Sequence, residues 1–227
     1  MTNIAPNRDR RTSVDVVFDH LYDEISSLNL LPGDKISEAE IAARFGVSRQ
    51  PVRDAFSRLE NLDLLLIRPQ RATEVKRFSS REITKSRFVR AAIESEVLRR
   101  AAAECDAMGA ARLDANLLMQ KVATDARDYE QFGKLDYEFH QTLCEIAKVD
   151  FAFEIIKQEK ASVDRLCMLS LSKEDRMALL LEDHQTIRDC ISTHDAEGAV
   201  AAGMLHLSRL DATIEAISEA NADYFDN

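Results

Sequence analysis

The chain has 227 residues with 45% hydrophobic and 31% charged side chains, a composition that predicts packed globular domains and argues against intrinsic disorder. Only 6 Gly and 4 Pro are present, too few for a β-sandwich or barrel that turns about every ten residues, so a mainly helical fold is expected. No apolar run is long enough for a membrane span and no signal-peptide pattern opens the chain, which predicts a cytoplasmic protein without membrane contact.

The charge is unevenly distributed along the chain. The formal net charge is -10, yet residues 1–80 contain 12 Lys+Arg and 12 Asp+Glu, so the whole excess of acid follows residue 80. Residues 44–77 hold eight basic and four acidic side chains, a local excess that can face DNA phosphates while the acidic remainder stays away from the duplex. This asymmetry predicts two domains with different roles, over residues 8–77 and 78–227.

The first predicted elements form a helix-turn-helix pattern. Apolar residues every three or four positions predict a helix over residues 13–29. A second helix is expected to end at Phe45, and a third to run from Ser48 to about Asn61. Gly46 separates them, because a positive φ at the end of a helix is easiest for glycine. Two short helices joined by a glycine turn are typical of the helix-turn-helix motif.

Serine residues are expected to cap both of these helices. Ser37, with Glu40 three residues later, predicts a capping box in which each side chain accepts a hydrogen bond from the backbone of the other. Ser48 is expected to cap the third helix, and Pro51 falls in its first turn, where the missing N–H has no intrahelical partner to lose.

A two-stranded β-wing is predicted next, with strands at residues 64–67 and 73–75. A recognition helix enters the major groove with its N-terminal residues first. Arg49 and Arg53 share one helical face, and arginine can donate two hydrogen bonds to guanine, whereas arginines of the wing are expected at the backbone or in the minor groove. The expected DNA-binding residues are Ser48, Arg49, Gln50, Arg53, Arg68 and Arg71. A solvated arginine face on an ordinary helical hairpin is the alternative.

Residues 31–38 (LPGDKISE) and 45–59 (FGVSRQPVRDAFSRL) resemble the winged helix of the GntR family of bacterial transcription regulators. The resemblance covers nearly all of residues 13–77 and implies a regulator that binds double-stranded DNA. The family usually has glycine where Asp63 stands, and Gln50 replaces a common threonine.

From residue 79 onward, polar caps and short loops separate amphipathic stretches, which predict an antiparallel bundle of about six helices. The fold class expected for the whole chain is therefore mainly α, with an N-terminal winged helix-turn-helix followed by this all-α bundle. The bundle helices are expected at residues 80–104, 109–124, 128–148, 151–171, 173–193 and 195–222.

Four residues of the bundle have the type and spacing of a metal site. Asp136 and His140 are four residues apart on one helical face, so that a carboxylate oxygen and an imidazole nitrogen can meet at one ion. His184 and His206 fall near the middle of the fifth and sixth bundle helices, with apolar flanks that place both against the core. Three imidazoles and one carboxylate suit Zn²⁺, Ni²⁺, Mn²⁺ or Co²⁺. For any one of these histidines alone, a hydrogen-bonded core residue is the simpler interpretation.

The second half of the chain, residues 80–222, resembles the all-helical FCD effector domain of the FadR subfamily of GntR regulators. The resemblance implies that the same Asp and three His bind a metal with open positions for a small carboxylate or water. It also implies that Arg90 contacts the carboxylate of that ligand; a salt-bridged structural arginine is the alternative.

The sequence thus predicts a homodimeric regulator, not an enzyme, that reads an inverted-repeat operator through two winged helices and responds to a small carboxylate at a divalent metal. Two alternatives remain open. The metal itself can be the signal, or the protein can be a metal-dependent enzyme with an accessory DNA-binding domain. The enzyme would need a general base near the metal, for which Glu138 and Glu145 lie on the right helix, although Glu138 is off the face of Asp136 and His140.

Overall fold

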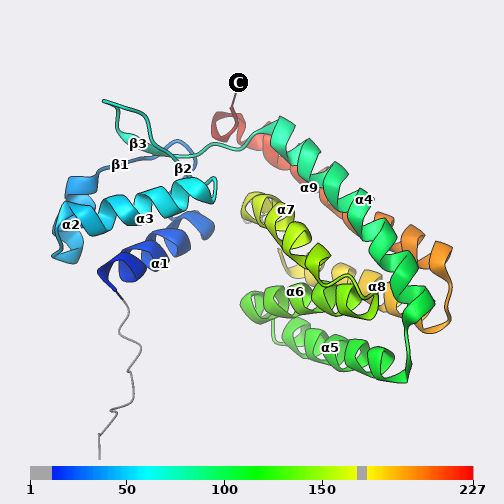
Figure 1. Cartoon of the computed structure of the whole chain (residues 1–227). Coiled ribbons are helices and arrows are strands. Elements are labelled where there is room, and N and C mark those ends of the chain that lie inside the picture. Colours follow the sequence, from blue (N-terminus) through cyan, green and yellow to red (C-terminus); the bar gives the residue numbers. More distant parts are fainter. Residues whose placement is uncertain (1–11, 168–172, 227) are drawn as a thin grey trace, which may run out of the picture. The chain divides into compact units, whose positions relative to one another are not determined.

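The structure is a computed structural model that describes residues 12–167 and 173–226. This part of the chain is mainly helical, as expected, and forms two compact units (Figure 1). One unit contains residues 12–79 together with the C-terminal residues 221–226, and the other spans Ser80–Ala220. Among the described helices, none is both long and apolar enough to cross a membrane.

The first unit combines a small helical core with a three-stranded sheet. In the sheet, β3 lies between β1 and β2 and runs antiparallel to both. Helices α1 and α3 pack against each other through their apolar faces, which are fully buried at Leu21 and Phe56. The elements are α1 (Ser13–Ser26), β1 (Lys35–Ile36), α2 (Glu38–Phe45), α3 (Arg49–Asn61), β2 (Leu65–Leu66) and β3 (Thr73–Val75).

The helix-turn-helix and the wing lie where the sequence predicts them. Helix α2 ends at Gly46, whose φ of +63° is in the left-handed region that favours glycine. Strands β2 and β3 are the two strands of the expected wing. Strand β1 is not predicted by the sequence pattern, because two residues carry no periodicity. It completes the sheet by pairing Lys35 with Glu74 and Ile36 with Thr73.

The serine caps predicted from the sequence are wrong in their hydrogen bonds. Ser37 and Ser48 do occupy N-cap positions with extended backbones, but neither hydroxyl bonds to its helix in the described structure. Acidic residues in the first turn of α2, Glu38 among them, instead place negative charge where the helix dipole favours it. A complete capping box is present at the start of α1, between Thr12 and Asp15.

Asp63, in the turn between α3 and β2, has a φ of +62°, which glycine adopts more easily than aspartate. Its carboxylate forms an exposed ion pair with Lys76, and such pairs contribute only about 0–1 kcal/mol. We expect Asp63→Gly to raise the free energy of unfolding in urea by about 0.5 kcal/mol, because relief of the backbone outweighs the lost pair. Asp63→Ala removes the same pair but keeps the strain, so it should be destabilising; equal shifts for both variants would contradict this explanation.

The C-terminal residues of the chain belong to the first unit. After a short 3-10 turn, η1 (Ala222–Tyr224), the N–H of Phe78 donates to the carbonyl of Tyr224, and the N–H of Asp226 donates to the carbonyl of Phe78, both at 2.8 Å. The rings of Phe78 and Phe225 lie 5.6 Å apart between centroids. The tail therefore forms a parallel bridge with the segment that follows the wing.

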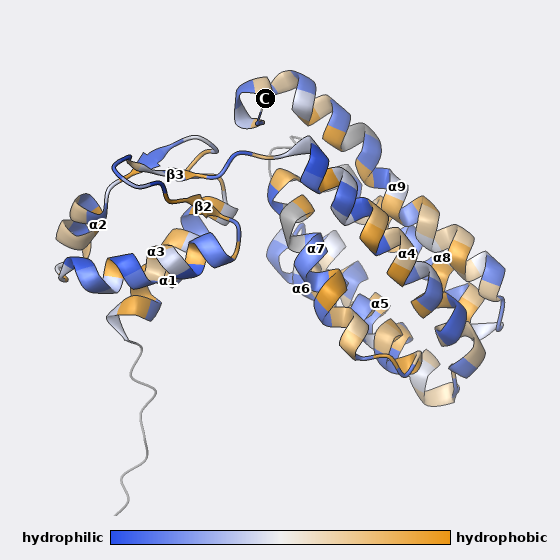
Figure 2. Cartoon of the chain, turned by 45° about the horizontal axis from the view of Figure 1, so that its top comes forward, coloured by the Kyte–Doolittle hydropathy of each residue, from blue (hydrophilic) through white to orange (hydrophobic). Residues whose placement is uncertain are grey.

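The second unit is the expected helical bundle, with helix ends that differ from the predicted ones by a few residues. Residues 168–171, which the sequence predicts as the end of the fourth bundle helix, lie outside the described residues. The helices of the bundle carry both hydrophobic and hydrophilic residues along their length (Figure 2). Within the bundle, α4 packs along α9, α5 along α6, and α8 along both α5 and α9. The helices are α4 (Ser80–Glu104), α5 (Ala107–Asp125), α6 (Tyr129–Ile146), α7 (Phe151–Cys167), α8 (Lys173–Ser192) and α9 (Ala196–Ala220).

Candidate metal centre and DNA-binding surface

The residues expected to bind DNA are all exposed on the first unit. Four of them lie at the N-terminal end of α3 and two lie on the wing, on either side of its tip. The opposite face of α3 is buried against α1, so Arg49, Gln50 and Arg53 lie on the face that α3 exposes to solvent. The exposed residues are Ser48, Arg49, Gln50, Arg53, Arg68 and Arg71.

Two of these side chains have partners that the sequence pattern does not reveal. Arg53 forms an ion pair with Glu38 of α2, with Nη2 and Oε2 3.0 Å apart, and Gln50 donates to Asp54 at 2.8 Å. Arg53 is 56% exposed, and ion pairs of this kind are weak in water. The pair therefore positions the guanidinium at the start of α3 without preventing its exchange for a DNA contact. The DNA-contacting roles of all six residues remain predictions.

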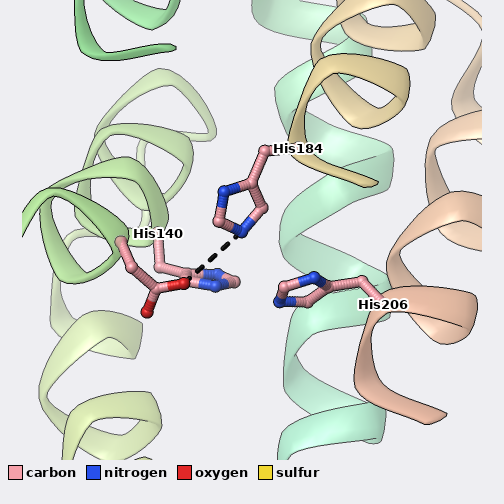
Figure 3. A group of neighbouring side chains, drawn as sticks. His140, His184 and His206 are labelled. Carbon is pink, nitrogen blue, oxygen red and sulfur yellow. Dashed lines mark ion pairs between the residues drawn. The ribbon is translucent and has the colours of Figure 1, made fainter. Parts of the chain in front are cut away.

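The four residues expected to hold a metal form one buried cluster. Asp136 and His140 come from α6, His184 from α8 and His206 from α9. One potential ligand atom of each lies within 4.8 Å of those of the others, and all four side chains are buried. Figure 3 shows the three imidazoles converging from their helices toward a common centre. This cluster could hold a metal ion once its donor atoms, which lie within 4.8 Å of one another, close in slightly, because two ligands about 2.0–2.2 Å from one ion are at most about 4.4 Å apart.

The inner nitrogens of the cluster lack partners. Nε2 of His140 and Nε2 of His184 are buried and have no hydrogen-bond partner among the described residues. Nε2 of His184 lies 3.5 Å from Oδ1 of Asp136, the contact drawn dashed in Figure 3. A buried polar atom without a partner costs about 1–3 kcal/mol, and a bound ion would remove that cost at several atoms together. The orphaned nitrogens and the donor set therefore fit a divalent metal.

The outer nitrogen of each imidazole faces an oxygen on another side chain. Nδ1 of His140 lies 3.3 Å from Glu94 of α4, and Nδ1 of His184 lies 2.8 Å from Oε1 of Gln120 of α5. Nδ1 of His206 lies 3.7 Å from a carboxylate oxygen of Asp183, on α8, which is too far for a hydrogen bond, and this nitrogen has no hydrogen-bond partner among the described residues. Metal-binding histidines commonly have such a partner behind them, because it orients the ring with Nε2 toward the ion.

Each carboxylate in and around the cluster is paired with a cation. The ammonium of Lys160 lies 3.0 Å from Oδ2 of Asp136. Nε of Arg90 donates to Glu94 at 2.7 Å, and Arg209 donates to both oxygens of Asp183 at 3.2 Å. Each of these three pairs is electrically neutral as a whole.

The cations keep the buried carboxylates ionised. Burial alone would raise the pKa of Asp136, but the Lys160 ammonium and the neighbouring imidazoles outweigh it, and the pKa lies well below its usual range. Burial likewise opposes ionisation of Glu94, yet Arg90 holds the pKa of that carboxyl well below its ordinary value. These carboxylates are therefore negatively charged at neutral pH.

The cationic forms of His184 and His206 are disfavoured. Burial lowers the pKa of His184 well below 6.5, and the nearby His206 lowers it further. Burial also lowers the pKa of His206, although Asp183 partly offsets that effect. A neutral imidazole has a lone pair to offer a metal, whereas an imidazolium does not.

Arg90, expected to contact an effector carboxylate, is buried behind the cluster. It is 3% exposed and donates a hydrogen bond to Glu94. It also lines a cavity of about 120 Å³ between α4, α7 and α9. The cavity is also lined by Arg87, Val163 and Leu207. At about 30 Å³ per water, this is room for about four waters, or for a carboxylate the size of acetate. The structure thus shows the ion pair expected of a structural arginine together with a cavity beside the guanidinium, and Asp136, His140, His184 and His206 are not among the residues that line this cavity.

The partners of the cluster were harder to predict than its ligands. Glu94 stands four residues after Arg90 and Asp183 directly precedes His184, so local spacing could have indicated both. Gln120 is 64 residues from His184 and carries no such signal. The carboxylates considered as catalytic bases lie elsewhere: Glu138 is exposed, and Glu145 pairs with Arg112 near the surface.

Each of the two units matches a known protein family. The family described as "Bacterial regulatory proteins, gntR family" matches residues 14–75, and the family described as "FCD domain" matches residues 87–209. Both matches lie inside the predicted domains, whose limits of 8–77 and 78–227 remain predictions.

Similar proteins cover most of the chain. The "HTH-type transcriptional repressor RspR" of Escherichia coli (strain K12) is 35% identical over 196 residues, covering 86% of each chain. The "Gluconate operon transcriptional repressor" of Bacillus licheniformis is 26% identical over 171 residues, covering 73% of this chain and 70% of the relative. Among solved structures, "E. coli McbR/YncC" shares the fold with a TM-score of 0.69 at 19% identity, covering 90% of this chain and 98% of that one.

These relatives are transcriptional regulators and not enzymes, as the sequence predicts. The winged helix and the helical bundle are matched in the same order and over most of their length. The protein belongs to the gntR family of bacterial regulatory proteins, as a DNA-binding transcriptional regulator with an FCD domain.

Proposed function

We propose that this regulator binds a divalent metal through Asp136, His140, His184 and His206, and that a small carboxylate bound at the metal changes its affinity for DNA. The observation that carries the proposal is the charge balance of the buried cluster, in which every carboxylate has a cationic partner. Zn²⁺, Ni²⁺, Mn²⁺ and Co²⁺ all accept three imidazoles and a carboxylate, so the donor set does not choose among them.

The charge balance gives a physical reason for an anionic effector. The charges of Asp136 and Lys160 cancel, as do those of Glu94 and Arg90, and burial favours the neutral forms of His184 and His206. A divalent ion would therefore add two positive charges to a buried site that has no spare anion among these groups. Uncompensated buried charge is costly, so the loaded site favours a ligand with negative charge. A small carboxylate supplies that charge.

We assign Arg90 as the residue that pairs with the effector carboxylate on the side away from the metal. Its guanidinium is held by Glu94 and borders the cavity that it shares with Arg87. Arginine matches the planar geometry of a carboxylate and remains charged when buried. The name of the gluconate operon repressor, a relative of this chain, refers to an operon for a small organic acid, which agrees with an effector of this chemical class.

DNA binding would follow the symmetry of a homodimer in the cytoplasm. Two winged helices related by a two-fold axis read the two halves of an inverted repeat. The carboxylate acts on DNA affinity only if it binds the DNA-competent and the DNA-incompetent arrangements with different strength.

A thermal-shift experiment on the full chain tests the anionic effector. Protein stripped of metal and protein reloaded with Zn²⁺ are each heated with a panel of small carboxylates and with the matching neutral amides, such as acetate against acetamide. At about 100 times its Kd, a ligand adds about 2.7 kcal/mol, or about 5–10 °C in Tm for a chain of this size. We expect such a rise for a carboxylate in the loaded protein only.

Two outcomes would contradict the effector proposal. Equal shifts with and without metal would separate the carboxylate from the ion, and equal shifts for acids and amides would remove the role of charge. If Zn²⁺ alone changes DNA affinity and no carboxylate adds to the change, the metal is the signal, which is the alternative that the sequence left open.

A further inference from the structure

A chain of three hydrogen bonds reaches His184 from the side away from the cluster. Nδ2 of Asn116 donates to the backbone carbonyl of Leu135 at 3.0 Å, and Nε2 of Gln120 donates to Oδ1 of Asn116 at 2.7 Å. Oε1 of Gln120 then lies 2.8 Å from Nδ1 of His184. The chain runs from the backbone of α6, through two side chains of α5, to the ring on α8.

The direction of every bond in this chain is fixed by its first member. A backbone carbonyl can only accept, so the Asn116 side chain must turn its NH₂ group toward Leu135 and its oxygen toward Gln120. Gln120 must then turn its own NH₂ group toward that oxygen, which leaves Oε1 facing His184. An oxygen can only accept there, so the proton of the imidazole belongs on Nδ1 and Nε2 is left with its lone pair.

Burial makes this arrangement strict. Gln120 and His184 are both 0% exposed, so no solvent water competes for their hydrogen bonds. The opposite orientation of the Gln120 amide would face its NH₂ group to Nδ1 and its oxygen to the oxygen of Asn116, leaving buried groups mismatched. Phe139 stacks on the His184 ring at 4.3 Å between centroids and limits its rotation.

We propose that Gln120, oriented by Asn116, is a positioning residue that holds His184 in the Nδ1–H tautomer and so presents Nε2 to the metal. The other two histidines of the cluster face carboxylates, whereas His184 faces a neutral amide. Gln120 thus selects the tautomer without adding a charge to the balanced cluster. The inference rests on metal binding at this cluster, as proposed above, but its first test needs no metal.

The first test reads the tautomer of His184 in the metal-free full chain by the ¹⁵N chemical shifts of its ring. The wild type should show Nδ1–H and an unprotonated Nε2. Gln120→Met removes both hydrogen bonds at similar volume and should give Nε2–H or a mixture. Asn116→Leu allows the Gln120 amide to flip and should also give a mixture of the two tautomers of His184. This variant replaces Gln120→Met in the test if Gln120→Met does not fold. Gln141→Met, an exposed glutamine on α6 that bonds Glu145, is the matched control.

The second test measures Zn²⁺ affinity of the same proteins. Loss of a partner behind a metal ligand costs about 10–100-fold in affinity, so Gln120→Met should bind Zn²⁺ about 10–100-fold more weakly, with Gln141→Met unchanged. Nδ1–H retained in both Gln120→Met and Asn116→Leu would overturn the inference, as would unchanged Zn²⁺ affinity in a Gln120→Met protein whose tautomer has changed. A wild type that shows the Nδ1–H tautomer yet does not bind Zn²⁺ would instead overturn the proposed function.

Discussion

The His184→Ala variant of the full chain is expected to bind divalent metal at least about 100-fold more weakly than the wild type. The imidazole is 0% exposed and contributes one of four ligand atoms to the cluster. Zinc sites with four protein ligands bind with about 10–16 kcal/mol, so one ligand accounts for about 3 kcal/mol, which is about 100-fold. His206→Ala should have a similar effect, because its ring comes from a different helix to the same centre.

The control for this change is His194→Ala. His194 lies in the turn between α8 and α9, where Nδ1 is 2.7 Å from the carbonyl of Ala102, outside the cluster. Its removal should leave metal affinity unchanged, as measured by competition with a chelating dye. Equal affinity of the wild type and His184→Ala would contradict the site. Loss of DNA binding through unfolding of His184→Ala would make the metal structural, whereas retained DNA binding without a response to carboxylates would make it part of the sensor.

The double variant Arg49→Ala with Arg53→Ala is expected to lose about 30-fold or more in affinity for a duplex that the wild type selects from a random pool. Each bidentate contact to guanine is worth about 1–3 kcal/mol, and two of them add to about 2–6 kcal/mol. Arg53 gives up its exposed pair with Glu38 to make the contact, which costs little. The loss should be largest for the selected sequence and smaller for unrelated DNA, because base contacts carry the specificity.

Two further variants separate base contacts from general charge. Arg100→Ala removes an exposed arginine of α4 that pairs with Glu96, and its DNA affinity should match that of the wild type. Arg68→Ala removes a predicted phosphate contact on the wing, so it should weaken binding to all sequences alike. The slope of log affinity against log salt concentration should become shallower by about one. Gel shifts at two salt concentrations measure both effects. An unchanged affinity of the double arginine variant would dismiss the assignment of α3 as the recognition helix.

Features set by local spacing could be predicted from the sequence. The helices, the glycine at the end of α2 and the wing strands follow from periodicity and from the backbone preferences of glycine. Asp136 and His140 are paired by one helical turn, and the resemblance to a known domain added His184 and His206 from two distant helices. The structure brings all four together.

Features set by tertiary packing could not be predicted. Strand β1 is recruited by β3 and has no pattern of its own. Lys160 reaches Asp136 from α7 and Gln120 reaches His184 from α5, across separations that periodicity does not cover. Arg53 turns toward Glu38 because α2 and α3 pack together, which the predicted arginine face of α3 alone does not imply. The missing information is which faces of the helices meet.

X-ray absorption at the metal edge of the reloaded full chain tests the central claim most directly. The account predicts a single shell of nitrogen and oxygen ligands at about 2.0–2.2 Å, with the multiple-scattering pattern of three imidazoles. The imidazole pattern should weaken in His184→Ala and stay unchanged in His194→Ala. A spectrum with sulfur ligands, or with oxygen ligands alone, would contradict the assignment of Asp136, His140, His184 and His206 as the metal site.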